Sequence, residues 1–216
     1  IEGEAGHFSL STPRGRVTAR DVVVATNGYT GRFAPWLRRR VIPIGSYIIA
    51  TEPLEPEEMA RTIPKNRNVS DTRKVVYYYR LSPDRRRMLF GGRVSHSETD
   101  PRRSAPLLHA EMSRLFPALA RVGISHSWMG FVAYTFDSLA HAGTRDGVHY
   151  AMGYCGSGVS MASYLGMRTG QKVLGLAAGA TGFDGTAFQT RPLYYGNPWF
   201  LGASISFYRW RDGLNV

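Results

Sequence analysis

Apolar residues in the first half of the chain fall into short runs bounded by turn signals, the pattern typical of β-strands. The run 22–25 reads Val-Val-Val-Ala without a polar break, which indicates a buried strand of the kind found in parallel sheets. This run leads into Asn27-Gly28, where the chain is expected to turn sharply. The other strand-like segments cover residues 7–11, 16–20, 41–52, 75–81, 88–92 and 124–135.

Helical spacing of apolar residues is clearest at residues 107–116 and in the long segment from about residue 158 to residue 180. A short helix is expected over residues 55–63, after two prolines. The tail from residue 191 is rich in aromatic residues and is expected to end in an amphipathic helix.

A glycine-rich turn joins the apolar strand 148–152 to the long helix. Gly153, Gly156 and Gly158 allow positive φ and let a ligand approach the backbone. A helix start also presents free N–H groups that favour negative charge. The pattern predicts either a cofactor site or a capped helix packed on a sheet, and spacing alone leaves both open.

The 216 residues, 43% of them hydrophobic and 12% aromatic, are enough to form a substantial core. The net charge of +11 permits anionic partners. Apart from the arginine triplets 38–40 and 85–87, however, the basic residues are scattered, and no nucleic-acid-binding motif is present, so we expect no nucleic-acid partner. No apolar run reaches 18 residues, so we expect no membrane partner. Cys155 is the single cysteine, which excludes an internal disulfide and favours a cytoplasmic location. The histidines lack metal-ligand spacing, so no metal site is expected.

The order of these elements predicts an α+β fold, in which an antiparallel sheet is inserted between two pieces of an α/β domain. We expect residues 1–39 to be the rear part of the binding domain and residues 40–147 to be the antiparallel substrate domain. Residues 148–216 would return to the binding domain, with the long helix and the aromatic tail.

Two motif interpretations fail on the residues present. A dinucleotide fingerprint needs Gly-x-Gly-x-x-Gly, but Met161 stands where the third glycine would follow Gly156 and Gly158. A nucleophile elbow at Cys155 would need a histidine later in the chain, and the last histidine is His149.

Five segments, in this order, carry a resemblance to a known family. They are Ala-Thr-Asn-Gly-Tyr-Thr (25–30), Pro-Ile-Gly-Ser-Tyr-Ile-Ile-Ala-Thr-Glu-Pro (43–53), Tyr-Tyr-Arg-Leu-Ser with Phe-Gly-Gly (78–82 and 90–92), Gly-Tyr-Cys-Gly-Ser-Gly (153–158) and Tyr-Gly-Asn-Pro-Trp-Phe (195–200). The chain resembles the C-terminal half of flavin-dependent amine and amino-acid oxidases of the D-amino-acid-oxidase/sarcosine-oxidase group. It is most similar to γ-glutamylputrescine oxidoreductase-like members.

The resemblance implies an FAD cofactor, whose Gly-x-Gly-x-x-Gly loop we expect to precede Ile1. It implies that the Asn-Gly turn, the glycine-rich turn and Gly130 contact the cofactor. Some members link the flavin covalently to a cysteine at the position where Gly130 stands, so the FAD is expected to be non-covalent. The implied cofactor-binding residues are Thr26, Asn27, Gly28, Gly130, Gly153, Tyr154, Cys155, Gly156, Ser157, Gly158 and Val159.

Four residues are candidates for substrate binding, and no catalytic residue is assigned. Arg93 could meet an anionic group or lie on the surface, while Tyr77 and Tyr79 share one face that is either a pocket wall or an aromatic sheet face. Ser160 and Gly156 stand where the resemblance implies cationic carboxylate anchors, so a longer amine fits better than a simple α-amino acid.

The resulting hypothesis is an FAD-dependent oxidoreductase that oxidises the C–N bond of a long amine to an imine. The alternative is a non-catalytic fragment or binding module that lacks the FAD pyrophosphate loop. The expected partners are a small-molecule amine and, for the chain itself, the N-terminal half of the protein or a second copy.

Overall fold

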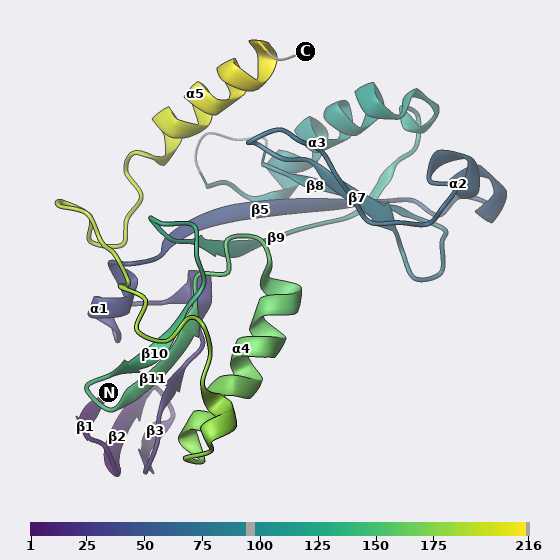
Figure 1. The fold of residues 1–216 in the computed structure, drawn as a ribbon. Coiled ribbons are helices and arrows are strands. Elements are labelled where there is room, and N and C mark those ends of the chain that lie inside the picture. The colour runs from purple at the N-terminus through teal and green to yellow at the C-terminus, as the bar shows by residue number, and fades with distance from the viewer. Residues whose placement is uncertain (94–97, 215–216) are drawn as a thin grey trace. The chain divides into compact units, whose positions relative to one another are not determined.

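The structure is a computed structural model that describes residues 1–93 and 98–214 (Figure 1). It shows a mixed α/β chain with several sheets. Contacts divide the chain into two compact units. Unit 1 combines Ile1–Ile44 with Phe131–Pro198, and unit 2 combines Gly45–Gly130 with Trp199–Val216. The domain boundaries expected from the sequence stay a prediction, although the C-terminal helix groups here with the middle of the chain.

Unit 1 contains two small sheets (Figure 1). In the first, β1 (Glu2–Glu4), β2 (His7–Thr12) and β3 (Gly15–Ala19) form an antiparallel meander. In the second, the order is β10 (His141–Arg145), β11 (Val148–Met152) and β4 (Val23–Val24). The pairing of β4 with β11 is parallel, as the unbroken valine run predicted, but it covers only two residue pairs. Strand β10 was not predicted as a separate strand.

Helix α4 (Gly158–Val173) follows β11 and packs on its sheet through Leu165, which is fully buried against alanines of β10 and β11. The helix ends near residue 173 rather than at residue 180, so the predicted length was wrong. Gly175 adopts φ +70°, and the N–H of Leu176 donates to the carbonyl of Gln171 at 2.9 Å. These features are a glycine C-terminal cap, which stops the helix.

The remaining elements of unit 1 are short: η1 (Asn27–Tyr29), α1 (Pro35–Arg38) and η3 (Ala177–Gly179). A hydrophobic core within unit 1 packs α1 against β4 and β11. Phe188 contributes to this core by stacking on the ring of Tyr150, with 5.8 Å between the ring centroids. The core therefore joins the tail segment before residue 198 to the strands.

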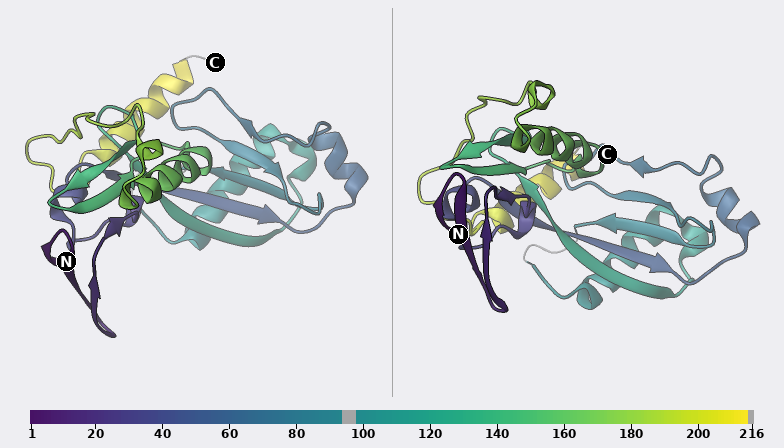
Figure 2. Two further views of the ribbon diagram at one scale, coloured as in Figure 1. Left: turned by 60° about the horizontal axis from the view of Figure 1, so that its bottom comes forward. Right: turned by 90° about the horizontal axis from the view of Figure 1, so that it is seen from below.

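Unit 2 is built on a five-stranded sheet in the order β6-β7-β8-β5-β9. Figure 2 shows its long strands in blue and teal from two further sides. The antiparallel hairpin predicted at residues 75–92 is confirmed as β7 and β8. The strands are β5 (Ile42–Thr51), β6 (Val69–Ser70), β7 (Tyr78–Leu81), β8 (Met88–Gly92) and β9 (Ile124–Tyr134). The helices are α2 (Pro56–Thr62), α3 (Pro101–Leu115), η2 (Pro117–Leu119) and α5 (Leu201–Leu214).

Helix α3 covers one face of this sheet, and the core between them is fully buried. The helix begins six residues before the predicted start because Asp100 caps it: its Oδ1 accepts the N–H of Arg102 at 2.7 Å. Pro101 occupies the first turn, where no N–H is needed, and Pro106 is tolerated inside the helix. Fully buried side chains of this core include Tyr47, Ile49, Phe90, Leu108 and Met112.

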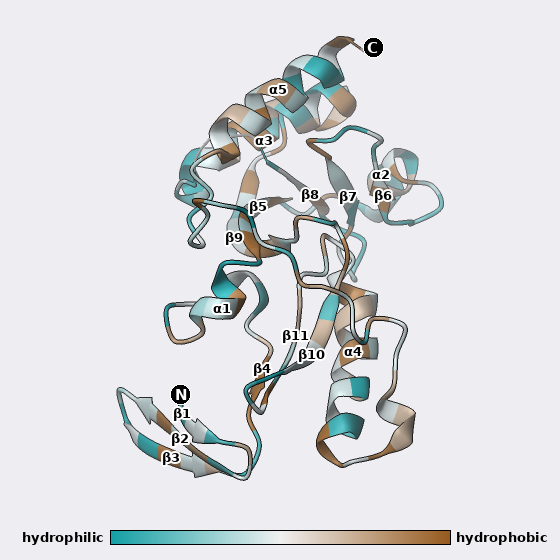
Figure 3. Ribbon diagram, turned by 60° about the vertical axis from the view of Figure 1, so that its left-hand side comes forward, coloured by the Kyte–Doolittle hydropathy of each residue, from teal (hydrophilic) through white to brown (hydrophobic). Residues whose placement is uncertain are grey.

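The aromatic tail forms α5, which confirms the predicted C-terminal helix. Figure 3 shows brown and pale residues in its first part and strongly hydrophilic residues toward its C-terminal end. Leu201 and Ile205 are its buried residues. Near its end, the Asp212 carboxylate accepts the backbone N–H groups of Lys74 and Val75 at 3.1 and 3.0 Å, which ties α5 to the loop before β7.

Candidate functional site

The predicted glycine turn connects β11 to α4 and has an unusual backbone. Gly153 and Gly156 have φ values of +77° and +98°, and Cys155 between them has φ +51°. Two distant groups fix this conformation: the Gly153 N–H donates to Oδ1 of Asn27 at 3.0 Å, and the Cys155 N–H donates to the carbonyl of Ala133 at 3.0 Å. The turn is therefore held rigidly from both sides.

The start of α4 is open. No side chain caps it, so its first N–H groups are left without intrahelical acceptors. Val159 in this first turn is 95% exposed, and a Cβ added at Gly156 would meet only the Tyr134 hydroxyl, at 3.7 Å. The helix dipole and these N–H groups favour an electron-rich group, so the turn could hold such a group of a cofactor or another ligand.

The second predicted turn lies beside the first, since Asn27 is the residue that joins them. Thr30 Oγ1 donates to the Asn27 carbonyl at 2.7 Å and lies 2.9 Å from Thr26 Oγ1. Asn27 itself has φ +48°. A Cβ on Gly28 would lie 2.8 Å from Phe131, so only glycine fits between this turn and β9. The structure thus brings Asn27 to the glycine turn, and cofactor binding by Thr26, Asn27 and Gly28 stays a prediction.

Side chains of the glycine turn have different orientations. Tyr154 points inward, where its hydroxyl donates to the Ala151 carbonyl at 2.9 Å and burial raises its pKa. Ser160 is exposed in the first turn of α4, and its hydroxyl donates to the Ser157 carbonyl at 3.2 Å. A ligand at this turn would therefore meet mostly backbone, together with the small side chains of Ser157 and Ser160.

A buried histidine–carboxylate pair behind the turn was not predicted from the sequence. His141 is 1% exposed, its Nε2 lies 3.1 Å from both oxygens of Asp137, and its ring stacks on Phe188 at 4.1 Å. Thr135 lies between this pair and the turn, because its Oγ1 donates to the Leu139 carbonyl at 2.9 Å and is 3.4 Å from the Cys155 sulfur. The four-residue spacing of Asp137 and His141 was the available signal.

The Asp137 carboxylate has a lowered pKa. Burial acts to raise it, but the hydrogen bonds from His141 and from the Leu139 N–H lower it more. A carboxyl group whose pKa is lower in the folded state stabilises the fold above its unfolded pKa, and this stabilisation is lost as the pH falls through the folded pKa.

Replacing Asp137 with asparagine should therefore lower the free energy of unfolding at pH 7 by about 1–3 kcal/mol. It should also make the melting temperature fall less between about pH 6 and about pH 3 than in the unchanged protein. Thermal melts across this range measure both effects. Asp146→Asn is the control, because Asp146 forms an exposed pair with Arg145 that should contribute little. If the melting temperature fell equally with pH in Asp137→Asn and in the unchanged protein, the Asp137 carboxylate would not be a source of this stabilisation.

The substrate candidates Tyr77 and Tyr79 lie on the sheet face covered by α3. The ring of Tyr77 is 5.4 Å from that of Phe90, and Tyr79 stacks on Phe90 at 5.9 Å. They therefore form an aromatic core face, and contact of either with substrate stays a prediction. Tyr78 points from the other face, where its hydroxyl bonds to Ser46 and its ring covers Gly91.

Arg93 is buried, with 7% of its side chain exposed, and not a surface residue. Its Nη1 donates to Glu98 Oε1 at 2.7 Å and to the Gly45 carbonyl at 3.0 Å. Its Nε and Nη2 are buried without a hydrogen-bond partner among the described residues. Gly130 lies in β9, half-buried, at the end of the first segment of unit 2.

Residues 1–93 and 98–214 contain no group of three or more His, Cys, Asp or Glu side chains that could hold a metal ion. Within the same ranges, none of the helices has both the length and the apolar character needed to cross a membrane.

Comparison with known proteins defines the class. The profile of the family described as FAD dependent oxidoreductase (DAO) matches residues 1–172. The chain belongs to this FAD-dependent oxidoreductase family. It is similar to solved flavoenzymes, among them glycine oxidase from Geobacillus kaustophilus, with a TM-score of 0.65, 18% identity and coverage of 87% of this chain and 50% of that one. At this identity the likeness shows the fold alone.

Two relatives are more similar in sequence. The gamma-glutamylputrescine oxidoreductase of Escherichia coli is 34% identical over 217 residues, which are 96% of this chain and 49% of the relative. A probable oxidoreductase, OrdL, of Rhizobium meliloti is 33% identical over 219 residues, covering 98% of this chain and 49% of the relative. The chain thus spans about half the length of the curated relatives it matches.

Proposed function

We propose that the full-length protein oxidises the C–N bond of an amine to an imine, with hydride transfer to the flavin ring of FAD. The observation that carries this proposal is the open glycine turn at the start of α4, held by Asn27 and Ala133 in a chain of an FAD-dependent family. The bound flavin would supply the redox chemistry. The protein would supply orientation and a fixed electrostatic environment.

The residues of the turn would act through their backbone. N–H groups fixed before the reaction stabilise charge that develops at a ligand edge without reorganisation, and a flavin gains negative charge when it accepts hydride. Residues 153–160 would lie at this edge, and the Thr26–Gly28 turn would support them. No side chain of this chain is assigned as a general acid or base, because an amine that binds in its neutral form needs none.

The proposed substrate is a long amine similar to γ-glutamylputrescine, the compound named for the Escherichia coli relative. Ser160 is neutral and exposed, and Gly156 has no side chain, so neither gives a salt bridge to the carboxylate of a simple α-amino acid. A charged hydrogen bond contributes on the order of 1.5–3 kcal/mol.

The full-length enzyme should therefore have a kcat/KM for γ-glutamylputrescine at least roughly ten- to a hundredfold above that for sarcosine. Steady-state assays with a dye as electron acceptor measure this ratio without assuming that O2 accepts the electrons. The Ser160→Lys variant is an informative companion, because it should raise sarcosine turnover selectively. Equal turnover of both amines by the unchanged enzyme would exclude the proposed specificity.

We propose that FAD is bound non-covalently, because Gly130 has no thiol to form a link and Cys155 is the only cysteine of the chain. Acid precipitation of the purified full-length protein should release all of the flavin into the supernatant, as measured by its visible absorbance. Flavin that stays with the precipitated protein, and is found by mass on a peptide of this chain, would refute non-covalent binding.

We infer a cytoplasmic protein whose antiparallel substrate module is inserted into an FAD-binding domain, with no nucleic-acid or membrane partner. Residues 1–216 would associate with the N-terminal half of the protein or, without it, with a second copy. The alternative is a non-catalytic binding module, for which the purified full-length protein would be colourless.

A further inference from the structure

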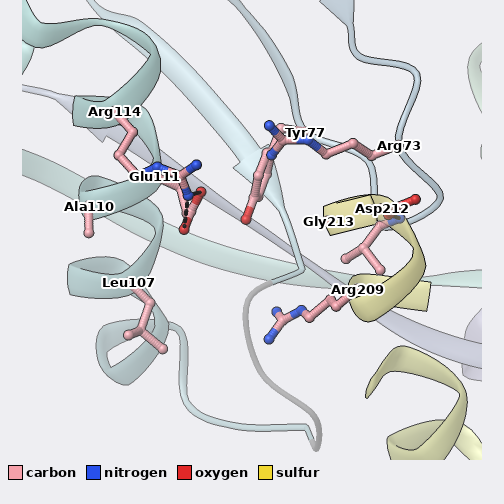
Figure 4. Close-up of a pocket in the computed structure, with 10 residues that line it drawn as sticks. Arg73, Tyr77, Leu107, Ala110, Glu111, Arg114, Arg209, Asp212 and Gly213 are labelled. Carbon is pink, nitrogen blue, oxygen red and sulfur yellow. Dashed lines mark hydrogen bonds and ion pairs between the residues drawn. The ribbon is translucent and has the colours of Figure 1, made fainter. Parts of the chain in front are cut away.

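A pocket of about 430 Å³ lies within unit 2, between α3, the loop before β7 and α5 (Figure 4). This volume is in the range of sites for small molecules. Three of its lining residues are arginines, Arg73, Arg114 and Arg209, and two are acidic, Glu111 and Asp212. The side chains that line it therefore carry one excess positive charge.

Both acidic side chains are already engaged. The Asp212 carboxylate accepts the N–H groups of Lys74 and Val75. Both oxygens of Glu111 accept hydrogen bonds from Arg114 Nη1, at 3.2 and 2.9 Å (Figure 4). These contacts leave little capacity in either carboxylate to neutralise a further cation.

Arg73 pairs with Asp71 at 3.5 Å and Arg114 with Glu111, so among these three arginines Arg209 is the cation left for a ligand. Its Nη2 donates to the Arg93 carbonyl at 2.8 Å, which orients the guanidinium. No carboxylate lies within ion-pair distance of it in the part of the chain that the structure describes. A guanidinium has five N–H donors, so donors remain. Figure 4 shows the side chain extending from α5 into the space between α5 and α3.

The rest of the wall is apolar or aromatic. Leu107 and Ala110 of α3 and Val75 line the pocket beside the ring of Tyr77. Leu107 is half-exposed, so its side chain is accessible to a ligand. Burial and the negative charge of Glu111 raise the pKa of Tyr77 to about 12, so its hydroxyl stays protonated at neutral pH.

We propose that this pocket binds a small organic carboxylate with an apolar body. The carboxylate pairs with Arg209, since a planar carboxylate matches the guanidinium fork, and the apolar body lies against Leu107 and the ring of Tyr77. The single excess charge fits one carboxylate. The inference goes beyond the proposed amine oxidation, because none of these residues belongs to the glycine turn.

Phenylacetate is a suitable probe, measured by isothermal titration calorimetry on the full-length protein. It should bind with a Kd of about 1 mM or below, and Arg209→Gln should weaken this binding roughly ten- to a hundredfold. Arg211→Gln is the matched control: it removes the same charge from α5, but Arg211 lies over Tyr208 and outside the pocket. It should change the Kd by less than about twofold.

Two other ligands and one further variant test which parts of phenylacetate the pocket recognises. Neutral phenylacetamide and inorganic phosphate should both bind much more weakly than phenylacetate, because each lacks one half of the recognised chemistry. Leu107→Glu, at an exposed position, should abolish phenylacetate binding without unfolding the protein. Absence of phenylacetate binding at about 10 mM, or equal binding by the Arg209→Gln variant, would overturn the proposal. Flavin content and amine turnover are separate readouts, so failure here would leave the proposed reaction unaffected.

Discussion

The full-length protein with Gly153→Ala is expected to be isolated with little bound FAD and a free energy of unfolding lowered by about 2–5 kcal/mol. Gly153 has φ +77°, a conformation that costs an alanine energy, and the added Cβ would lie 2.4 Å from Cγ2 of Thr135. The turn would have to move away from Asn27 and so lose the hydrogen bond that holds it. Flavin absorbance per mole of protein and a thermal melt measure the two effects.

Gly182→Ala is the matched control for this variant. Gly182 lies in a loop of unit 1, has no positive φ, and an added Cβ there would meet nothing within 4 Å. Its stability and flavin content should match those of the unchanged protein. If Gly153→Ala also kept full flavin content and an unchanged melt, the rigid turn would not be what positions the cofactor.

Local signals were enough to predict much of the fold. The strand before Gly153, the helix after Gly158 and the β7–β8 hairpin all follow from periodicity and turn residues within a few positions of each other. The tip of the hairpin is set by Ser82, whose hydroxyl bonds to Asp84, a contact between near neighbours. Such elements can be predicted because the interactions that form them are contained in a short window.

Helix ends were harder to predict, since they depend on single capping groups. The apolar spacing of residues 107–116 predicted a start for α3 near residue 107, but the cap at Asp100 starts the helix at Pro101. Helix α4 was predicted to run to about residue 180, although Gly175 at φ +70° ends it. In both cases the helix end depends on a capping residue rather than on the apolar spacing.

The contacts within the candidate site could not be predicted from the sequence, and cofactor binding by its residues stays a prediction. Asn27 and Gly153 are 126 positions apart, and no pattern in the sequence states that one accepts from the other. For the tyrosines, alternation shows that residues 77 and 79 share a face, but only packing against α3 shows that this is the core face. For Arg93 the sequence left both a substrate contact and a surface position open, because its partner Gly45 is 48 positions away and cannot be inferred from the segment around Arg93.

Glu98→Ala is the second variant with a large expected effect, because Glu98 satisfies three groups at once. Its Oε1 accepts from Arg93 Nη1 at 2.7 Å and from the Gly45 N–H at 3.0 Å, and its Oε2 accepts from the Tyr47 hydroxyl at 2.8 Å. Truncation would leave the 7%-exposed Arg93 without its counter-charge. Breaking a buried pair costs about 3–5 kcal/mol, and because 36% of Glu98 is exposed, water should limit the loss to about 2–4 kcal/mol.

Chemical unfolding of the full-length protein measures this loss, and two further variants test its cause. Glu55→Ala should change the free energy of unfolding by less than about 0.5 kcal/mol, since Glu55 and Arg86 form an exposed pair 3.6 Å apart. The double variant Arg93→Met with Glu98→Ala should regain part of the stability, because no buried charge is then left unpaired. A double variant less stable than Glu98→Ala alone would show that packing of the Arg93 side chain, rather than its unpaired charge, determines the cost.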